Sequence, residues 1–544
     1  GLDGVDDAYV ESQRHLLQPS AHNPRPTTVP PPIEGLSGHH LRHKTVVSVI
    51  GLPLRGQAHI AKRLQHYLDF FHGAHTEMFN VNDYADRPRG DDELLEALRN
   101  HFDSGGQGKQ KHAIIYTTNA WAAAGSQWSG HSKSRRRWMK NALEAELSAE
   151  LYLVEIQVND ELEHNLQYIQ KHHLCQEQSD ARNIIANYSK RFVTIQDDGT
   201  EDDLNYTKVI DYNKKVVTNN MMQTFLGSRM ARFLGNVHPY QHHIFLARCG
   251  ESEYVAAGKI GGDSGLSPLG HEFALRLAEF ADFGVCKQAS SFTCVSLTAD
   301  QARCLVDRLA LPKNMAAGVV AKGAWDDVPD STGRPCAVRE GMRLTRFLLQ
   351  GATTFQDAPA TVTEVVRAVD GRPVTLIFTD PASATAGDTV FCRLWTSSLL
   401  RAKQTAARFP RRDIAVEDGK VWQQLGPREY RNLNDLYHGE YEGLSSAEIL
   451  LRQPEEAELR NRDKLGYRYP RGESYYDVIA RLDDTILQLE SYQEPVIIVA
   501  HQAIIRLLYA YLKGIPREQA PDLDVPVHSV ISFKYDGTGD MEER

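Results

Sequence analysis

Short apolar runs alternate with amphipathic segments along the first half of the chain. The runs at 45–50 (TVVSVI), 112–118 (HAIIYTT) and 150–158 (ELYLVEIQV) are largely apolar, as expected of parallel strands covered on both faces. The amphipathic segment IAKRLQHYLDFF follows the first run after a glycine-containing loop. This alternation predicts an α/β domain with a parallel sheet over residues 44–240.

A second series of strands begins at residues 243–248 (HIFLAR). It continues at 389–397 (TVFCRLWTS) and 495–502 (PVIIVAHQ), so a second α/β domain is expected over 241–544. A Gly/Ala/Thr/Asp-rich stretch with its own apolar run, VTLIF, interrupts this series at about 287–388. We interpret that stretch as a partly ordered insertion.

Composition sets limits on the kind of protein this is. With 544 residues and 41% hydrophobic content, the chain can bury two or three cores. Residues 1–43 combine many prolines with polar side chains and predict a disordered tail. The net charge of −10 argues against a nucleic-acid or anionic-membrane partner. The one strong basic cluster, Arg135 to Arg137, is expected to be a solvated helix start.

The seven cysteines include no CxxC pair and no metal-ligand spacing. Their odd number favours a reduced, intracellular protein, and no metal site is expected. No window of about 18 apolar residues and no signal pattern is present, which predicts a cytoplasmic protein.

One glycine-containing loop has the context of a nucleotide-binding loop. Residues 51–58 (GLPLRGQA) follow a strand and open a helix, as G-x-x-x-x-G-K-[ST] requires. Gln57 stands where a lysine should neutralise phosphates, and Ala58 where a hydroxyl should bind magnesium. We therefore interpret the loop as a turn kept for its geometry, whose backbone amides could hold an anion weakly.

Polar side chains follow three strands of the second domain. Because the carboxyl ends of parallel strands meet at one edge of a sheet, we expect these side chains to converge on a ligand. Arginine suits bidentate phosphate binding, and an acid, for which Asp435 is the candidate, is needed to protonate a departing sugar oxygen. Each residue alone also fits a structural role, but together they predict a phosphate pocket. The converging residues are Arg248, Cys249, Glu251, Arg401, His501, Gln502 and Arg506.

Eight segments make the chain similar to a known family: GLPLRG, FNVNDY, RCGESE, GKIGGDSGLSPLG, WTSSLLRAKQTA, LNDLYHGEYEGL, RDKLGYRYPRGESYYD and VAHQAIIR. The chain resembles the bifunctional 6-phosphofructo-2-kinase/fructose-2,6-bisphosphatases, whose second half belongs to the histidine phosphatase (phosphoglycerate mutase-like) superfamily. The resemblance covers about residues 44–286 and 389–535. It implies an α/β protein with a P-loop kinase-like parallel-sheet domain followed by a histidine-phosphatase-like domain.

In the kinase half, the resemblance implies lost chemistry. Gln57 and Ala58 replace the family's loop lysine and Thr/Ser, Thr117 its catalytic aspartate, and Ala85 an arginine of the sugar-phosphate site. ATP and Mg²⁺ are the cofactors that the family implies, but phosphoryl transfer from ATP is not expected here. Residual nucleotide binding stays open, because some positions still match. The residues of this degenerate nucleotide site are Gly51, Arg55, Gly56, Gln57, Ala58, Asn159 and Lys208.

In the phosphatase half, the resemblance implies a largely retained pocket. Four positions depart from the family: Asp435 for the acid glutamate, Val255 for an asparagine, Ser446 for a tyrosine, and Cys249 for the histidine that accepts the phosphoryl group. The matching positions are Arg248, Glu251, Arg401, His501, Gln502 and Arg506, together with Arg460, Lys464 and Tyr475 of the sugar and 6-phosphate site.

Two interpretations of Cys249 remain. Neighbouring arginines and His501 would lower the pKa of its thiol and make a thiolate nucleophile. Alternatively, the cysteine fills the space and disables turnover while an anion pocket remains. We favour the second, because Val255 rather than an arginine stands six residues later, and because a cysteine sulfur lies closer to its backbone than a histidine's far nitrogen.

The sequence therefore predicts a regulatory pseudoenzyme that binds fructose 2,6-bisphosphate or fructose 6-phosphate. The alternative is a slow fructose-2,6-bisphosphatase that uses Cys249 or His501. A third possibility places the function in the insertion at 287–388. A homodimer, or a heteromer with an active relative, is the expected assembly, and neither nucleic acid nor a membrane is an expected partner.

Overall fold

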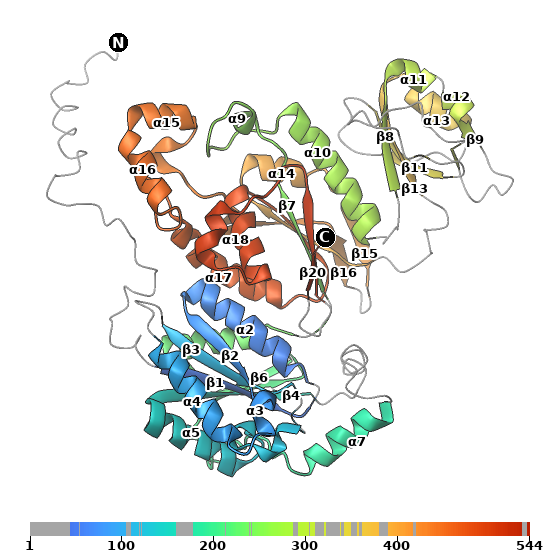
Figure 1. The fold of residues 1–544 in the computed structure, drawn as a ribbon. Coiled ribbons are helices and arrows are strands. Elements are labelled where there is room, and N and C mark those ends of the chain that lie inside the picture. Colours follow the sequence, from blue (N-terminus) through green and yellow to red (C-terminus); the bar gives the residue numbers. More distant parts are fainter. Residues whose placement is uncertain are drawn as a thin grey trace.

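The computed structural model describes most of the chain between residues 44 and 543; the tail 1–43 and Asn159 lie outside the described part. The described residues form three six-stranded sheets and one two-stranded sheet (Figure 1). They are 44–53, 55–104, 110–118, 120, 122–158, 178–212, 214–238, 240, 242–286, 292–303, 305–310, 320–321, 338, 342–349, 356–357, 362–379, 390–416, 420–535 and 541–543.

The first sheet has the strand order β2-β3-β1-β4-β5-β6, with β1 inside it. All neighbours are parallel except β5 and the edge strand β6, which are antiparallel. The strands predicted at 45–50, 112–118 and 150–158 are confirmed as β1, β3 and β4. The strands are β1 (Lys44–Gly51), β2 (His75–Asn80), β3 (Lys111–Tyr116), β4 (Ala149–Gln157), β5 (Asn205–Ile210) and β6 (Lys215–Asn219).

Helices cover both faces of this sheet, which explains why β1 is buried along nearly its whole length. Helices α2 and α8 pack on one face, and α4 and α5 on the other. The helices of this half are α2 (Gln57–His72), α3 (Asn82–Ala85), α4 (Gly90–Asp103), α5 (Lys133–Leu147), α7 (Gln178–Ser189) and α8 (Phe225–Leu234).

The basic cluster at the start of α5 differs from its prediction. Arg136 is fully buried rather than solvated, because its guanidinium forms two bonds of 2.8 and 2.9 Å with the equally buried carboxylate of Glu201. Arg135 and Arg137 instead donate to backbone carbonyls of nearby loops. A buried tertiary partner 65 residues away explains the error.

The second sheet has the order β17-β14-β18-β7-β19-β20. Its first four strands are parallel, and β19 and β20 are antiparallel to their neighbours. The predicted strand at 389–397 is shorter than expected, since among its described residues, 390–397, only the last five are extended. The strands are β7 (His242–Arg248), β14 (Arg393–Ser397), β17 (Pro427–Tyr430), β18 (Val496–Ala500), β19 (Val530–Tyr535) and β20 (Met541–Glu543).

Helices also cover both faces of the second sheet. Residues of α10 and α14 pack into one core, and residues of α17 and α18 into another. The remaining elements are α9 (Glu253–Ala256), α10 (Pro268–Glu279), α14 (Leu400–Ala406), β15 (Arg412–Ala415), β16 (Val421–Gln424), α15 (Ser446–Arg452), α16 (Pro454–Arg462), α17 (Tyr475–Glu490) and α18 (Gln502–Lys513), with short 3-10 turns at Arg431–Leu433, Gly439–Tyr441 and Arg517–Asp522.

The described residues between 292 and 379 form a separate antiparallel sheet with the order β8-β13-β11-β10-β9, and β12 pairs with β11. Figure 1 shows this inserted unit standing apart from the other two bodies. It has its own core, which includes Leu305, Val365 and Leu376. Its elements are β8 (Phe292–Leu297), α11 (Ala299–Arg303), α12 (Leu305–Arg308), β9 (Leu309–Ala310), β10 (Val320–Ala321), β11 (Arg343–Leu349), β12 (Gln356–Asp357), α13 (Val362–Val369) and β13 (Val374–Thr379).

Helix α2 links the two larger bodies. One hydrophobic core contains residues of α2 and α8 together with residues of α17 and α18. Figure 1 shows α2 at the boundary, beside the helices of the second body. Within the part of the chain that the structure describes, no helix is long and apolar enough to cross a membrane.

Candidate functional site

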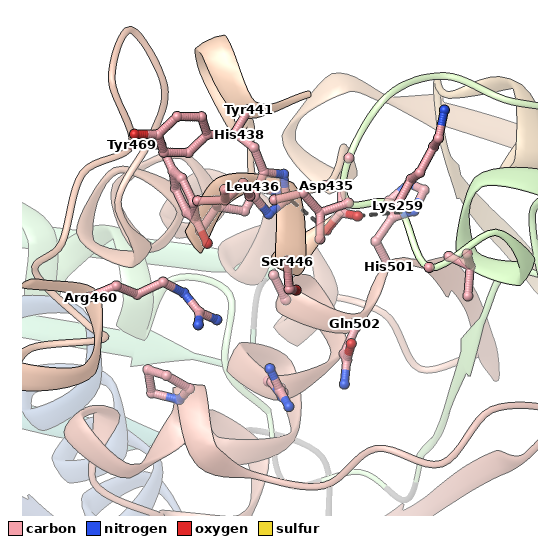
Figure 2. Close-up of a pocket in the computed structure, with 18 of the residues that line it drawn as sticks. Lys259, Asp435, Leu436, His438, Tyr441, Ser446, Arg460, Tyr469, His501 and Gln502 are labelled. Carbon is pink, nitrogen blue, oxygen red and sulfur yellow. Dashed lines mark hydrogen bonds and ion pairs between the residues drawn. The ribbon is translucent and has the colours of Figure 1, made fainter. Parts of the chain in front are cut away.

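The carboxyl ends of four neighbouring parallel strands, β17, β14, β18 and β7, open into one cavity of about 600 Å³. All eleven residues predicted for the phosphatase half line it, from Arg248 to Arg506. Six cationic and three acidic side chains lie among the described lining residues, so the cavity favours anions. Figure 2 shows Arg460 and Gln502 on opposite sides of the cavity, with Asp435 and His501 close together near Lys259.

Cys249 stands directly after β7, and its backbone N–H donates to the carbonyl of Ala500 at the end of β18 (2.7 Å). This bond holds its thiol beside His501, with 3.6 Å between Cys249 Sγ and His501 Nδ1. Burial raises the pKa of the Cys249 thiol from 9.0 to about 11, although Arg401 and Arg248 act in the opposite direction. The lowered pKa required for a thiolate nucleophile is therefore not found, because desolvation outweighs the arginines.

His501 caps α18 and is almost completely buried. Its Nε2 is hydrogen-bonded to Ser397 Oγ at the end of β14 (2.7 Å). Burial lowers the pKa of His501 to about 3, and Arg401 adds to this effect while Asp435 opposes it. The imidazole is therefore neutral at pH 7. Its Nδ1 lies on the side of the ring that faces the Cys249 thiol.

Asp435 and Arg401 form an ion pair inside the cavity. Arg401 Nη2 donates to Asp435 Oδ2 (2.9 Å), and Arg401 Nη1 donates to the carbonyl of Gly262 (2.6 Å). Desolvation would raise the pKa of Asp435, but the charge of Arg401 and the hydrogen bond from Leu436 N–H help to hold it below its usual value. Asp435 is thus a carboxylate at neutral pH, and in this arrangement it has no proton to give to a leaving oxygen.

Arg506 and Tyr475 meet at another part of the cavity wall. Arg506 Nε donates to the carbonyl of Leu523 (2.6 Å), and its Nη1 lies 3.4 Å from Tyr475 Oη. Arg460 is exposed on α16, and Lys464 forms an ion pair with the exposed Asp522. These cations belong to different elements from Arg248 and Arg401, and Arg506 lies near enough to Arg248 to help lower its pKa.

The remaining predicted residues also have defined places. Glu251 accepts a hydrogen bond from Ser267 Oγ (2.7 Å), which joins the loop after β7 to the start of α10. Arg248 donates to the carbonyl of Val525 (3.0 Å), and burial lowers its pKa. Gln502 is the first residue of α18 and faces the cavity.

Several contributors were not singled out from the sequence. Lys259, His438 and Tyr469 line the cavity, and Arg481 holds the loop that carries Asp435 by donating to the carbonyl of Asn434 (2.8 Å). Lys259 and His438 lie within the segments GKIGGDSGLSPLG and LNDLYHGEYEGL, which could have drawn attention to them. Arg481 lies seven residues into α17, and no sequence signal identifies it.

The glycine loop before α2 is closed by the side chain of Gln57, the first residue of that helix. Gln57 is buried, its Nε2 donates to the carbonyl of Leu52 (2.5 Å), and its Oε1 accepts from Arg55 N–H (3.2 Å). Tyr212 donates to the carbonyl of Arg55 (3.0 Å). The turn uses Gly56 in the left-handed conformation (φ 74°). The glutamine therefore occupies a loop amide that a phosphate would need.

The other predicted nucleotide-site residues do not restore this function. Lys208 donates to the carbonyl of Ile195 (2.8 Å), and Thr117 is buried after β3. Asn159 lies outside the described residues. In the described ranges, no group of three or more His, Cys, Asp or Glu side chains could hold a metal ion. Gln57 and Ala58 supply neither the charge nor the hydroxyl that Mg²⁺-ATP needs at this loop, so the residues present do not fit Mg²⁺-ATP.

Comparisons with known proteins agree with this geometry. Residues 382–543 match the family model of the Histidine phosphatase superfamily (branch 1). The 6-phosphofructo-2-kinase/fructose-2,6-bisphosphatase of Arabidopsis thaliana is 26% identical over 92% of this chain and 54% of its own length. The fructose-2,6-bisphosphatase of Saccharomyces cerevisiae is 24% identical over 90% of this chain and 86% of its own length.

Over about nine tenths of its length, the chain is similar to the 6-phosphofructo-2-kinase/fructose-2,6-bisphosphatases at 24–26% identity. The part of the chain that matches the histidine phosphatase model carries β14, β17, β18, β19 and β20 of the second sheet, and the inserted unit separates it from β7. A solved structure, the alpha-ribazole phosphatase from Shigella flexneri, is 16% identical and covers 54% of this chain and 89% of its own length, with a TM-score of 0.29. The chain spans about half the length of the Arabidopsis relative.

Proposed function

We propose that this chain binds a fructose phosphate in its C-terminal cavity without efficient turnover, as a regulatory pseudoenzyme of this family. The observation that carries the proposal is the protonated state of the Cys249 thiol. This thiol, with a pKa raised to about 11, stands where the resemblance places the phosphoryl-accepting histidine. A protonated thiol is a weak nucleophile, whereas the cationic cavity around it can still bind phosphate.

The closed loop before α2 supports an inactive kinase half. Phosphoryl transfer from ATP needs a lysine and a magnesium ligand at the loop, and Gln57 and Ala58 offer neither. The contacts of Gln57 with Leu52 and Arg55 also compete with phosphate for the loop.

Cations from several elements of the cavity wall support a ligand with two anionic groups. Arg248 and Arg401 lie at the strand ends, and Arg460 and Arg506 lie on helices farther along the chain. Fructose 2,6-bisphosphate carries two phosphates that these cations could bind, whereas fructose 6-phosphate carries one. Relatives named for fructose 2,6-bisphosphate chemistry add to this choice.

The test is a calorimetric titration of fructose 2,6-bisphosphate into the purified chain, with phosphate release followed in the same samples. We expect binding without release, and release gained in the variant Cys249→His. Rapid release by the unmodified chain would overturn the proposal. Absence of binding would overturn it as well, and would direct attention to the inserted unit.

A second candidate, slow hydrolysis, is favoured by one observation at His501. Ser397 Oγ lies 3.1 Å from Asn434 Oδ1 as well as 2.7 Å from His501 Nε2. When Ser397 donates to Asn434, His501 keeps its proton on Nε2 and turns an unprotonated Nδ1 toward the cavity, as a nucleophile requires. Release that persists in Cys249→Ser and disappears in His501→Asn would support this candidate.

We also propose a cytoplasmic location, supported by Cys286 and Cys392, which lie in one core as free thiols. The resemblance favours a homodimer or a heteromer with an active relative. Sedimentation of the chain alone and mixed with such a relative measures this, and a monomer in both samples would exclude it.

A further inference from the structure

Arg63, in the middle of α2, joins the two larger bodies through a buried network. Its guanidinium forms an ion pair with Glu490, the last residue of α17, and both side chains are about 4% exposed or less. The same group donates to Tyr511 Oη on α18 (3.2 Å) and to Tyr535 Oη at the end of β19 (3.0 Å). One side chain of the kinase-like half thus holds three elements of the phosphatase half.

Two of those elements begin at the cavity. Helix α17 starts with Tyr475, and α18 starts with Gln502 directly after His501. Tyr511 lies nine residues after Gln502, which is about 14 Å along a helix. The far ends of both helices are therefore fixed by Arg63, while their near ends carry the Tyr475–Arg506 contact.

A second set of contacts holds α17 along its length. Tyr67, one turn after Arg63 on α2, donates to Asp483 Oδ1 (2.8 Å), and Arg229 of α8 lies 3.0 Å from Asp483 Oδ2. Tyr67 also stacks on Phe233, with ring centroids 4.4 Å apart. The separation between α17 and α18 is therefore set by residues of the kinase-like half as well as by the phosphatase core.

We infer that the kinase-like half serves as a brace for the phosphate cavity, and that Arg63 is a positioning residue for the Tyr475–Arg506 end of it. This inference rests on the proposed function for its ligand. Loosening the far ends of α17 and α18 moves Tyr475 and Arg506 relative to Arg248 and Arg401. A ligand with two phosphates then loses one of its two sites, whereas a single phosphate at the strand ends does not.

The test compares Arg63→Met with Arg136→Met. Arg136 makes a buried ion pair of the same kind with Glu201, but entirely inside the kinase-like half. Calorimetry with fructose 2,6-bisphosphate and with inorganic phosphate is run on both variants of the full chain. We expect Arg63→Met to weaken bisphosphate binding about tenfold, within the range of typical couplings, and to leave phosphate binding unchanged. Arg136→Met should change neither.

Equal loss of bisphosphate affinity in both variants, or no loss in Arg63→Met, would overturn the inference. Tyr535→Phe serves if Arg63→Met fails to fold, because it removes one hydrogen bond and leaves the ion pair in place. The expected result for Tyr535→Phe is a smaller loss in the same direction. Unchanged bisphosphate affinity in Tyr535→Phe and in a folded Arg63→Lys would also count against the brace.

Hydrogen exchange separates this inference from the proposed function, because it needs no ligand. In Arg63→Met we expect faster amide exchange at 475–480 and 503–508, at the cavity ends of α17 and α18, but not in β1. If the unmodified chain binds no bisphosphate while this exchange pattern appears, only the proposed function fails. Unchanged exchange at both helix starts overturns the brace.

Discussion

At the scale of single residues, Cys249 decides what the cavity can do. The sulfur lies beside His501 and near two arginines, which would stabilise a thiolate, yet burial dominates and raises its pKa to about 11. The same surroundings keep His501 neutral and Asp435 ionised. At neutral pH the pocket therefore holds a protonated thiol, a neutral imidazole and a carboxylate.

Alkylation of Cys249 by iodoacetamide measures this directly. A rise in pKa from 9.0 to about 11 lowers the thiolate fraction at pH 7.5 about a hundredfold, so the reaction should be about that much slower than in the unfolded chain. The rate should rise about tenfold per pH unit from pH 7 to 10. Mass spectrometry of the peptide that carries Cys249 gives the rate. A plateau below pH 9 would revive the thiolate interpretation.

At the scale of elements, α2 connects a closed loop to a domain contact. Its first residue, Gln57, bonds back to Leu52 and Arg55, and the middle of the helix carries Arg63 and Tyr67. A glutamine in place of the lysine thus does more than remove a charge, because it ties the loop to the helix that contacts the phosphatase half. Helix α2 thus closes the glycine loop at its first residue and contacts the phosphatase half at its middle.

The variant Gln57→Ala tests what the closed loop contributes. It removes two hydrogen bonds to the loop backbone, so the free energy of unfolding should fall by about 1–2 kcal/mol. Gln65→Ala is the matched control on the same helix, because Gln65 donates a single bond of 2.8 Å, to the carbonyl of Thr76. Urea unfolding should show the smaller loss for Gln65→Ala. An unchanged stability of Gln57→Ala would mean that the loop does not need its side chain.

At the scale of the whole molecule, buried histidines make stability depend on pH. Burial is the largest cause of each shift, and it lowers the ring pKa values from 6.5 to about 3 or 4. Below pH 6.5 the unfolded chain binds protons that the folded chain does not, so stability falls as pH falls. The histidines are His59, His66, His72 and His501 at about 3, and His112, His131 and His242 at about 4.

Urea unfolding at pH 8, 7, 6 and 5.5 should show this effect. Each such histidine contributes a loss of about 1.4 kcal/mol per pH unit below 6.5, and stability should be nearly constant from pH 8 to 7. Two buried carboxyls with raised pKa values, Glu155 and Asp483, act in the opposite direction but are fewer. The variant His112→Gln should reduce the pH dependence of the free energy of unfolding by about 1.4 kcal/mol per pH unit, the contribution of one histidine. Equal stability at pH 7 and 5.5 would contradict the argument.

Much of the fold and the cavity residues that follow strand ends could be predicted from local signals, whereas Arg460, Lys464 and Tyr475 came only from the family resemblance. Continuous β-branched runs such as 45–50 mark covered strands, and polar residues just after strands meet at one sheet edge. The long-range contacts between the two larger bodies and the protonation states of the cavity residues could not be predicted from the sequence. Arg63 and Glu490 are 427 residues apart, and the pKa of Cys249 depends on a balance of desolvation and charge that only the packed structure sets.

The inserted unit also determines when the cavity can come into existence. Strand β7 ends at Arg248, but its neighbours β18 and β19 come about 250 and 280 residues later, on the far side of the insertion. A ribosome therefore releases β7 long before either partner is made, and contacts so distant in sequence form slowly. The inserted unit, whose paired strands lie closer together in sequence, can fold during that interval. Until residues 496–535 emerge, the nascent chain carries β7 without either of its sheet partners, and an unpaired apolar strand is prone to aggregate.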